Sequence, residues 1–95
     1  MQFIALEIET PTASSEDFEP HLKAEAQHVW KLQQQGLIRE AYFRVDQHTA
    51  VLILECANLT EALELTSGFP LVQHGLIRFD IIPLAPYSGL SRLFA

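Results

Sequence analysis

Four strand-like segments alternate with two helix-like segments in this chain, and that order constrains the fold more than any other feature of the sequence. The strand-like segments are short and rich in β-branched and aromatic residues. They span residues 3–9, 37–45, 49–56 and 76–84. The first helix is expected from Ser14 or Ser15 to about Gln35, and the second from its cap at Asn58 to Gly68.

Local signals set the limits of both helices. Pro20 is tolerated only near a helix start, so the regular part of the first helix is expected to settle around it. Gly36 is a natural left-handed terminator for that helix. Glu61 lies three positions after Asn58 and completes a capping box. Pro70 is expected to block any continuation of the second helix.

The connections between the strands decide the topology. The short turn at 46–48 makes the middle two strands an antiparallel hairpin. With right-handed crossovers, the order βαββαβ gives a four-stranded antiparallel sheet with two helices on one face. This is the α+β ferredoxin-like plait. A chain of 95 residues forms one domain, expected over residues 1–84 and followed by a tail at 85–95.

Alternation along the strands indicates that the second face of the sheet is covered too. One set of positions is nearly all apolar, and the intervening set mixes apolar residues with charges of both signs. The apolar set is Ile4, Leu6, Ile8, Ala41, Phe43, Val45, Ile77, Phe79 and Ile81. Because the helices cover one face only and segment 49–56 is apolar on both sides, we expect the mixed face to be a subunit interface. The alternative is a solvated face.

The C-terminal tail is too apolar for a free end, and it therefore supports an oligomer. Its apolar residues are Leu84, Tyr87, Leu90, Leu93 and Phe94. The tail is expected either to fold back on its own subunit or to lie across a neighbour. We therefore expect a homodimer or a higher homo-oligomer.

Composition excludes several classes of protein. The net charge of −6 and the pI near 5.0 argue against nucleic acid and anionic lipid as partners. The single cysteine, Cys56, excludes an internal disulfide and a thiolate cluster. The apolar runs are too short for a membrane span, and no signal peptide is recognisable, so the expected location is the cytoplasm.

Glu25 is the most informative polar residue of the first helix. At ~100° per residue, Phe18, Leu22, Val29 and Leu32 form one apolar stripe, and Glu25 lies close to its middle. Burying a carboxylate there is costly and raises its pKa. One interpretation is an acid or base that lines a pocket. The other is a carboxylate that pairs with an arginine or reaches solvent at the edge.

Four further aromatic or imidazole residues have a functional and a structural interpretation. His21 and His28 flank Glu25 at spacings that metal ligands use, but no further ligand lies nearby, so no metal is expected. His48 begins the third strand, where it is either a proton-transfer group or an exposed loop residue. Trp30 either walls a pocket or packs under a loop.

Arginine side chains on the second strand are candidate anchors for an anion. Arg39 and Arg44 lie on opposite sides of that strand, and Tyr42 shares a side with Glu40 and Arg44. The guanidinium fork binds a small carboxylate bidentately. The alternative is an ion pair across the sheet or across the subunit interface.

Several short segments match a pattern seen in one known family. The first helix carries Leu22-Lys23-Ala24-Glu25 and ends with Leu32-Gln33-Gln34-Gln35-Gly36. Arg39 follows three residues later, and the hairpin ends at His48. The remaining matches are Glu55, Glu61-Ala62-Leu63 and Phe69-Pro70-Leu71. On these residues, the chain resembles the muconolactone isomerase family.

This resemblance implies a dimeric α+β barrel that uses no cofactor. Members of the family move a proton within an unsaturated lactone that carries a carboxylate, and relatives eliminate halide from a chlorinated version. Carried over, Glu25 and His48 would handle the proton, Arg39 would anchor the anion, and Lys23 would be a weaker second cation. Tyr42 and Trp30 are the further candidates for contact with a small-molecule substrate.

The predicted function is a cofactor-free isomerase that shifts a proton in a small acidic lactone or a related enolisable compound. The alternative is a dimeric α+β barrel without lactone isomerase activity. Such a protein would bind a small molecule, act like a cofactor-free monooxygenase, or serve as a structural subunit of a larger assembly.

Overall fold

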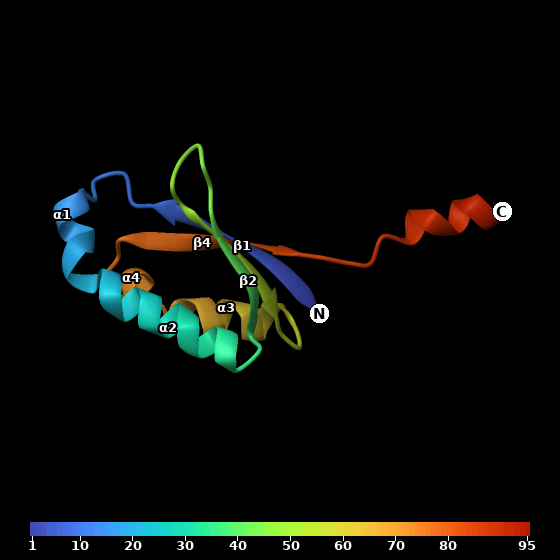
Figure 1. The fold of residues 1–95 in the computed structure, drawn as a ribbon, viewed down its shortest axis with the longest axis horizontal. Helices are drawn as coiled ribbons and strands as arrows, with labels where there is room; N and C mark the ends of the chain where they lie inside the picture. The colour runs from blue at the N-terminus through green and yellow to red at the C-terminus, as the bar shows by residue number, and fades with distance from the viewer.

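The computed structural model describes all 95 residues and contains the four predicted strands and both helical regions (Figure 1). The strands form one antiparallel sheet in the order β2-β3-β1-β4, with the helices on one side of it. This arrangement confirms the ferredoxin-like α+β fold. The elements are β1 (Gln2–Glu9), α1 (Ser15–Phe18), the 3₁₀ turn η1 (Glu19–His21), α2 (Leu22–Gln34), β2 (Ile38–Phe43), β3 (Ala50–Glu55), α3 (Leu59–Ser67), α4 (Pro70–Gln73), β4 (Ile77–Pro83) and η2 (Ser88–Phe94).

Two prolines change the helices from the predicted form. The first helix is not continuous, because Pro20 lies inside η1 and separates α1 from α2. Pro70 does more than stop a helix, since it occupies the first position of α4, where its missing N–H costs nothing. The predicted cap is confirmed: the Asn58 side chain accepts a hydrogen bond from the Glu61 backbone N–H at 2.9 Å.

The chain leaves α2 as predicted and enters a strand that is shorter than predicted. Gly36 has a φ of +76°, the left-handed conformation that suits glycine after a helix. β2 ends at Phe43, so the predicted extension to Val45 is wrong. A register shift between Ile38 and Glu40 marks a bulge at the start of the strand.

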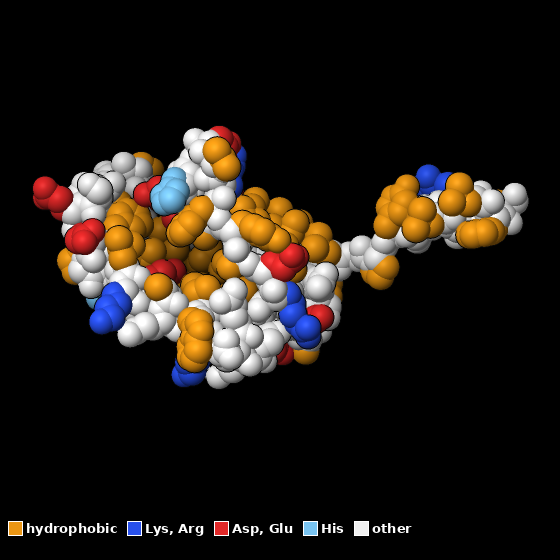
Figure 2. Space-filling model, in the orientation of Figure 1, with side chains coloured by type: hydrophobic (Ala, Val, Ile, Leu, Met, Phe, Trp, Pro, Cys, Tyr) orange, Lys and Arg blue, Asp and Glu red, His pale blue; other side chains and the backbone are white.

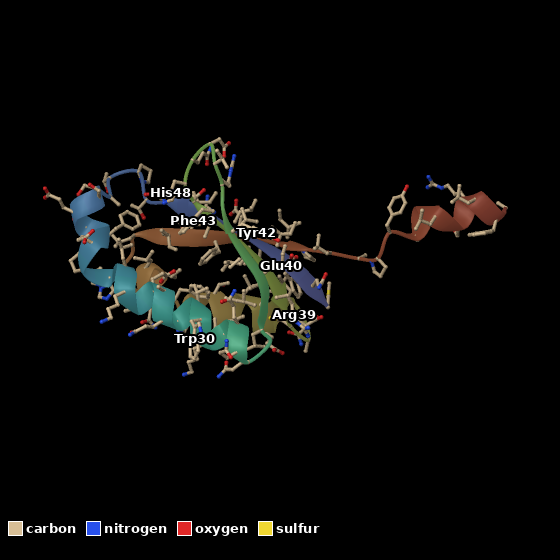
Figure 3. All side chains as sticks on the ribbon, viewed as in Figure 1. Trp30, Arg39, Glu40, Tyr42, Phe43 and His48 are labelled. Atoms are coloured by element: carbon tan, nitrogen blue, oxygen red, sulfur yellow. The ribbon has the colours of Figure 1, made fainter.

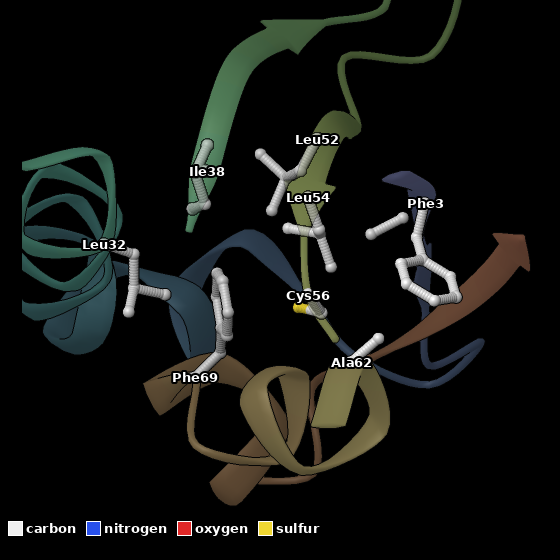
Figure 4. Packing of buried hydrophobic residues seen from close by; sticks show 9 residues of the cluster. Phe3, Leu32, Ile38, Leu52, Leu54, Cys56, Ala62 and Phe69 are labelled. Carbon is white, nitrogen blue, oxygen red and sulfur yellow. The ribbon is translucent and has the colours of Figure 1, made fainter. Parts of the chain in front are cut away.

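The hydrophobic core lies between α2, α3 and one end of the sheet (Figure 4). Phe3 and Ala5 of β1 are completely buried, and so are Leu54 of β3 and Phe69 before α4. Burying a large apolar side chain stabilises the fold by about 1.5–3 kcal/mol. The layers of helix and sheet are therefore closely packed at this end, and Leu32 packs α2 against the sheet.

The strand register corrects the predicted grouping of β1 with its neighbours. Phe3 pairs with Leu54, and Ala5 pairs with Leu52, so these buried residues lie on the helix side. Glu7 lies on the same side, opposite Phe79 of β4. Ile4, Leu6 and Ile8 therefore do not share a face with Phe79. They lie on the outer face, which is more apolar than predicted.

The C-terminal segment extends away from the sheet and ends in η2 (Figure 1). As a result, the molecule measures 56 × 28 × 20 Å along its principal axes. Tyr87, Leu90, Leu93 and Phe94 are all largely exposed on this segment. No helix of the chain has both the length and the apolar character needed to cross a membrane.

Candidate functional site

A cavity of about 820 Å³ lies between α1, α2 and the helix side of the sheet. Of the 20 residues that line it, 13 are hydrophobic. Figure 2 shows it as a hollow with apolar walls and acidic side chains inside, with a histidine at the rim. Its volume lies in the range of about 300–1,000 Å³ that is typical of small-molecule sites.

Small side chains contribute to the space. Three of the lining residues are alanines, Ala26 on α2 and Ala41 and Ala50 on the sheet, and a methyl side chain fills little of the cavity. Leu22, the first residue of α2, also lines the cavity and is 46 % exposed although it belongs to the apolar stripe.

Glu25 points from α2 into this cavity. Its Oε1 accepts a hydrogen bond from the backbone N–H of Leu71 at 3.0 Å, across to the start of α4. Burial raises the pKa of the Glu25 carboxyl, the Leu71 hydrogen bond opposes that rise, and the nearby Glu7 charge adds to it. No arginine or lysine pairs with it. Glu25 is thus a half-buried carboxylate beside an apolar space.

Glu7 is a second carboxylate in the cavity, and the sequence analysis missed it. Its Oε1 accepts a hydrogen bond from the backbone N–H of Ala50 at 3.2 Å. Burial raises the pKa of Glu7, whereas the Ala50 hydrogen bond and the charge of His48 lower it and the charge of Glu9 raises it. The sequence pattern alone does not show that Glu7 shares the helix side with Phe3 and Ala5, because both alternating sets of β1 are apolar before Glu7.

His48 lies at the rim of the cavity, in the loop between β2 and β3. It is the one non-glycine residue with a positive φ, at 54°. The loop holds this conformation through the Arg44 and Thr49 backbones: the His48 N–H donates to the Arg44 carbonyl at 3.0 Å. The imidazole stacks on Phe43, with ring centroids 4.5 Å apart and planes 19° apart. The backbone therefore presents the ring to the cavity at the edge of the sheet.

The structure brings three of the six predicted site residues together. Glu25, His48 and Trp30 line the cavity, whereas Arg39 and Lys23 do not. Tyr42 borders the cavity, but it pairs with Val51, so its side chain lies on the outer face of the sheet. Figure 3 places Trp30 on α2 and shows Arg39 at the far end of β2 from His48. The Tyr42 hydroxyl donates to Glu40 Oε1 at 2.7 Å, and that contact raises the pKa of Tyr42.

The two arginines predicted as anion anchors interact with other carboxylates. Arg44 binds Asp46 in the hairpin loop, with its Nη2 atom 2.7 Å from Oδ2. Arg39 acts on Glu55, whose pKa is lowered first by the N-terminal ammonium at 2.6 Å and further by the Arg39 charge. Neither guanidinium is positioned in the cavity.

The two histidines beside Glu25 do not form a metal site with it. His21 stacks on His74 with ring centroids 3.8 Å apart, and His28 packs its ring edge-on against Phe69 at 4.8 Å. Burial lowers the pKa of His28, whose Nε2 is buried without a hydrogen-bond partner. No group of three or more histidine, cysteine or acidic side chains is arranged to hold a metal ion.

Fold and cavity together define the class: a ferredoxin-like α+β domain with an acid-lined apolar cavity between helix and sheet. No protein-family model matches the chain, and no curated protein matches it either. Among solved structures it is similar to the 5-chloro-2-hydroxyhydroquinone dehydrochlorinase TftG from Burkholderia phenoliruptrix AC1100, in complex with 2,5-dihydroxybenzoquinone. The two share 15 % identity over 94 % of this chain and 98 % of that one, with a TM-score of 0.64. At this identity, the likeness shows the fold.

Proposed function

We propose that this protein is a cofactor-free enzyme that shifts a proton within a small enolisable compound, such as an unsaturated lactone, with Glu25 as the base. The observation that carries the proposal is the position of Glu25, a half-buried carboxylate that faces an apolar cavity of ligand size. A pKa raised towards neutral makes a carboxylate an effective proton-transfer group at physiological pH.

The reaction needs no group beyond those in the cavity. Glu25 takes the proton from the carbon beside the carbonyl, and the electron pair of that C–H bond moves to give an enolate. The same proton returns at the conjugated position, so the double bond moves and the composition is unchanged. The imidazole of His48, at the cavity rim, donates a hydrogen bond to the enolate oxygen while negative charge develops there.

The direct test follows the conjugated product by ultraviolet absorbance, with muconolactone and an uncharged unsaturated lactone as substrates. The Glu25→Gln variant keeps an oxygen for the Leu71 N–H but cannot take a proton. We expect it to lose ~10²–10⁴-fold in kcat, the usual contribution of general acid–base catalysis. Glu64→Gln, on the exposed side of α3, is the matched control. Equal turnover by the parent and Glu25→Gln, or none by the parent above background, would reject the isomerase.

A second candidate reaction is the elimination of hydrogen chloride from a chlorinated hydroquinone. The structural likeness to TftG favours it, because a carboxylate base and an apolar cavity serve elimination as well as isomerisation. Glu25 would take the proton and chloride would leave with the bonding electrons. Chloride release from 5-chloro-2-hydroxyhydroquinone, lost in Glu25→Gln, would support this reaction, and its absence would exclude it.

We also propose that two copies of the chain pack through the outer face of the sheet. The centre of this face is the apolar row Ile53, Ile4 and Ile82, continued by Val51 and Leu6 of the next row. Charges of both signs flank it, as in the Arg78–Asp80 ion pair of β4. A two-fold interface must be complementary to itself, which such a mixed border allows. In this assembly, the exposed tail at 85–95 lies across the partner.

A further inference from the structure

The charged side chains around the cavity all have the same sign. Glu7, Glu9, Glu19 and Glu25 line it, and no lysine or arginine does. Arg44, which follows the lining residue Phe43 in the sequence, already binds Asp46. His48 is the one histidine of the lining. The cavity therefore has no fixed positive charge for an anionic ligand.

The two inner carboxylates keep acceptor capacity for a ligand. Glu7 and Glu25 each use Oε1 to accept one backbone N–H, from Ala50 and from Leu71. Oε2 of each accepts no hydrogen bond from the protein. An ionised carboxylate only accepts hydrogen bonds, and its capacity exceeds the one bond made here. A ligand that donates from a hydroxyl group suits both positions.

We propose that the cavity selects ligands without negative charge, namely uncharged rings that carry hydroxyl groups, and that Glu7 and Glu25 together set this selectivity. The walls supply the rest of the recognition, since Phe18, Phe43, Phe69, Phe79 and Trp30 line the same space and favour a flat ring. The proposal rests on the proposed function in taking the cavity as the substrate site. It also narrows the substrate class from acidic lactones to uncharged compounds.

The physical reason is the weak screening of charge in a half-buried site. A second negative charge placed a few ångströms from a carboxylate raises the energy of the complex there far more than it does in water. We therefore expect an anionic ring to bind at least about tenfold more weakly than an uncharged ring of the same shape.

The test compares two probes that differ at one group, 4-hydroxybenzyl alcohol and 4-hydroxybenzoate, at neutral pH. Binding is followed by ¹H–¹⁵N nuclear magnetic resonance on the full chain, at the backbone amides of Ala50 and Leu71 and at the indole N–H of Trp30. These amides report on the cavity because they donate to Glu7 and Glu25. We expect the alcohol to shift all three signals and to bind at least about tenfold more tightly than the benzoate. Equal or tighter binding of the benzoate, or no shift with either probe, overturns the proposal.

Variants assign the selectivity to the two carboxylates. Glu7→Gln and Glu25→Gln each keep a carbonyl oxygen for their backbone partner, so the fold is expected to survive. Each should tighten 4-hydroxybenzoate binding several-fold relative to the alcohol, because the repulsion between the side-chain carboxylate and the benzoate carboxylate is removed, whereas Glu64→Gln should leave this ratio unchanged. Unchanged benzoate affinity in Glu7→Gln removes Glu7 from the proposal. Because binding is read without turnover, a catalytically silent protein that keeps this selectivity refutes the proposed function and not this inference.

Discussion

The backbone at His48 offers a test of how the hairpin loop positions its ring. A φ of 54° is costly for a residue with a Cβ, by about 1–2 kcal/mol, and costs glycine nothing. We compare His48→Ala, which keeps the Cβ, with His48→Gly, which removes it. Both variants lose the stacking contact between the imidazole and Phe43, so that contact cancels in the comparison.

The magnitudes give an unusual order of stability. Loss of the ring stack destabilises each variant by about 0.5–1.5 kcal/mol. Glycine relieves the backbone strain, which raises the free energy of unfolding by about 1–2 kcal/mol relative to alanine. The greater entropy of glycine in the unfolded chain lowers it by about 0.5–1 kcal/mol. At the midpoints of these ranges, His48→Gly should therefore be more stable than His48→Ala by about 0.8 kcal/mol, although glycine is the weaker residue in most structured positions.

Urea denaturation, followed by the fluorescence of the single Trp30, measures this difference at equal m-values. In thermal unfolding, it corresponds to about 2–8 °C for a chain of this size. If His48→Ala is as stable as His48→Gly or more so, the left-handed conformation is not what the loop imposes. Turnover rates distinguish a catalytic role of the imidazole from an effect of the backbone conformation. If the imidazole takes part in the reaction, both variants should lose the same fraction of turnover.

Two further predictions concern the stability and assembly of the chain. Because burial raises the pKa of Glu25, the folded protein still holds a proton at a pH, just above 4.5, where the unfolded chain has released it. The contribution of Glu25 to the free energy of unfolding therefore falls as the pH rises from about 4.5 through the pKa of the folded state. Glu25→Gln should then gain stability relative to the parent between acidic and neutral pH in urea titrations; parallel profiles would show that the carboxylate is fully solvated. For assembly, light scattering should give at least a dimer for the full chain, and deletion of 85–95 should raise the dissociation constant several-fold. A monomeric full chain, or a dimer indifferent to the deletion, would contradict the interface or the role of the tail.

The fold was predictable where the signal is local. Asn58 caps its helix and Gly36 ends the other one because each residue's own side chain, or lack of one, determines the backbone there. The effect of Pro20 was harder to place, because a proline near a helix start is compatible with one helix or with two. The structure resolves this with a 3₁₀ turn between α1 and α2.

The site was predictable on the helix and not on the first strand. Helical geometry alone places Glu25 within the apolar stripe, whatever the sheet does. On β1, both alternating sets are apolar up to Glu7, so the pattern does not say which set faces the helices. The pairing of Phe3 with Leu54 decides that, and it is a contact between residues far apart in the sequence. Whether Arg39 reaches the cavity depended on tertiary structure in the same way.

The position of Glu7 also shows that stability does not account for the cavity. Its neighbours on the same face of β1, Phe3 and Ala5, are completely buried, and an apolar residue at position 7 would continue that core. Burial of Glu7 and Glu25 raises the pKa of both groups, and so their ionisation opposes folding at neutral pH. The cavity beside Glu7 stays open at Ala26, Ala41 and Ala50, where larger side chains would add apolar contacts. A chain that places two carboxylates and three small residues around one space forgoes stability there, as binding and catalytic sites do.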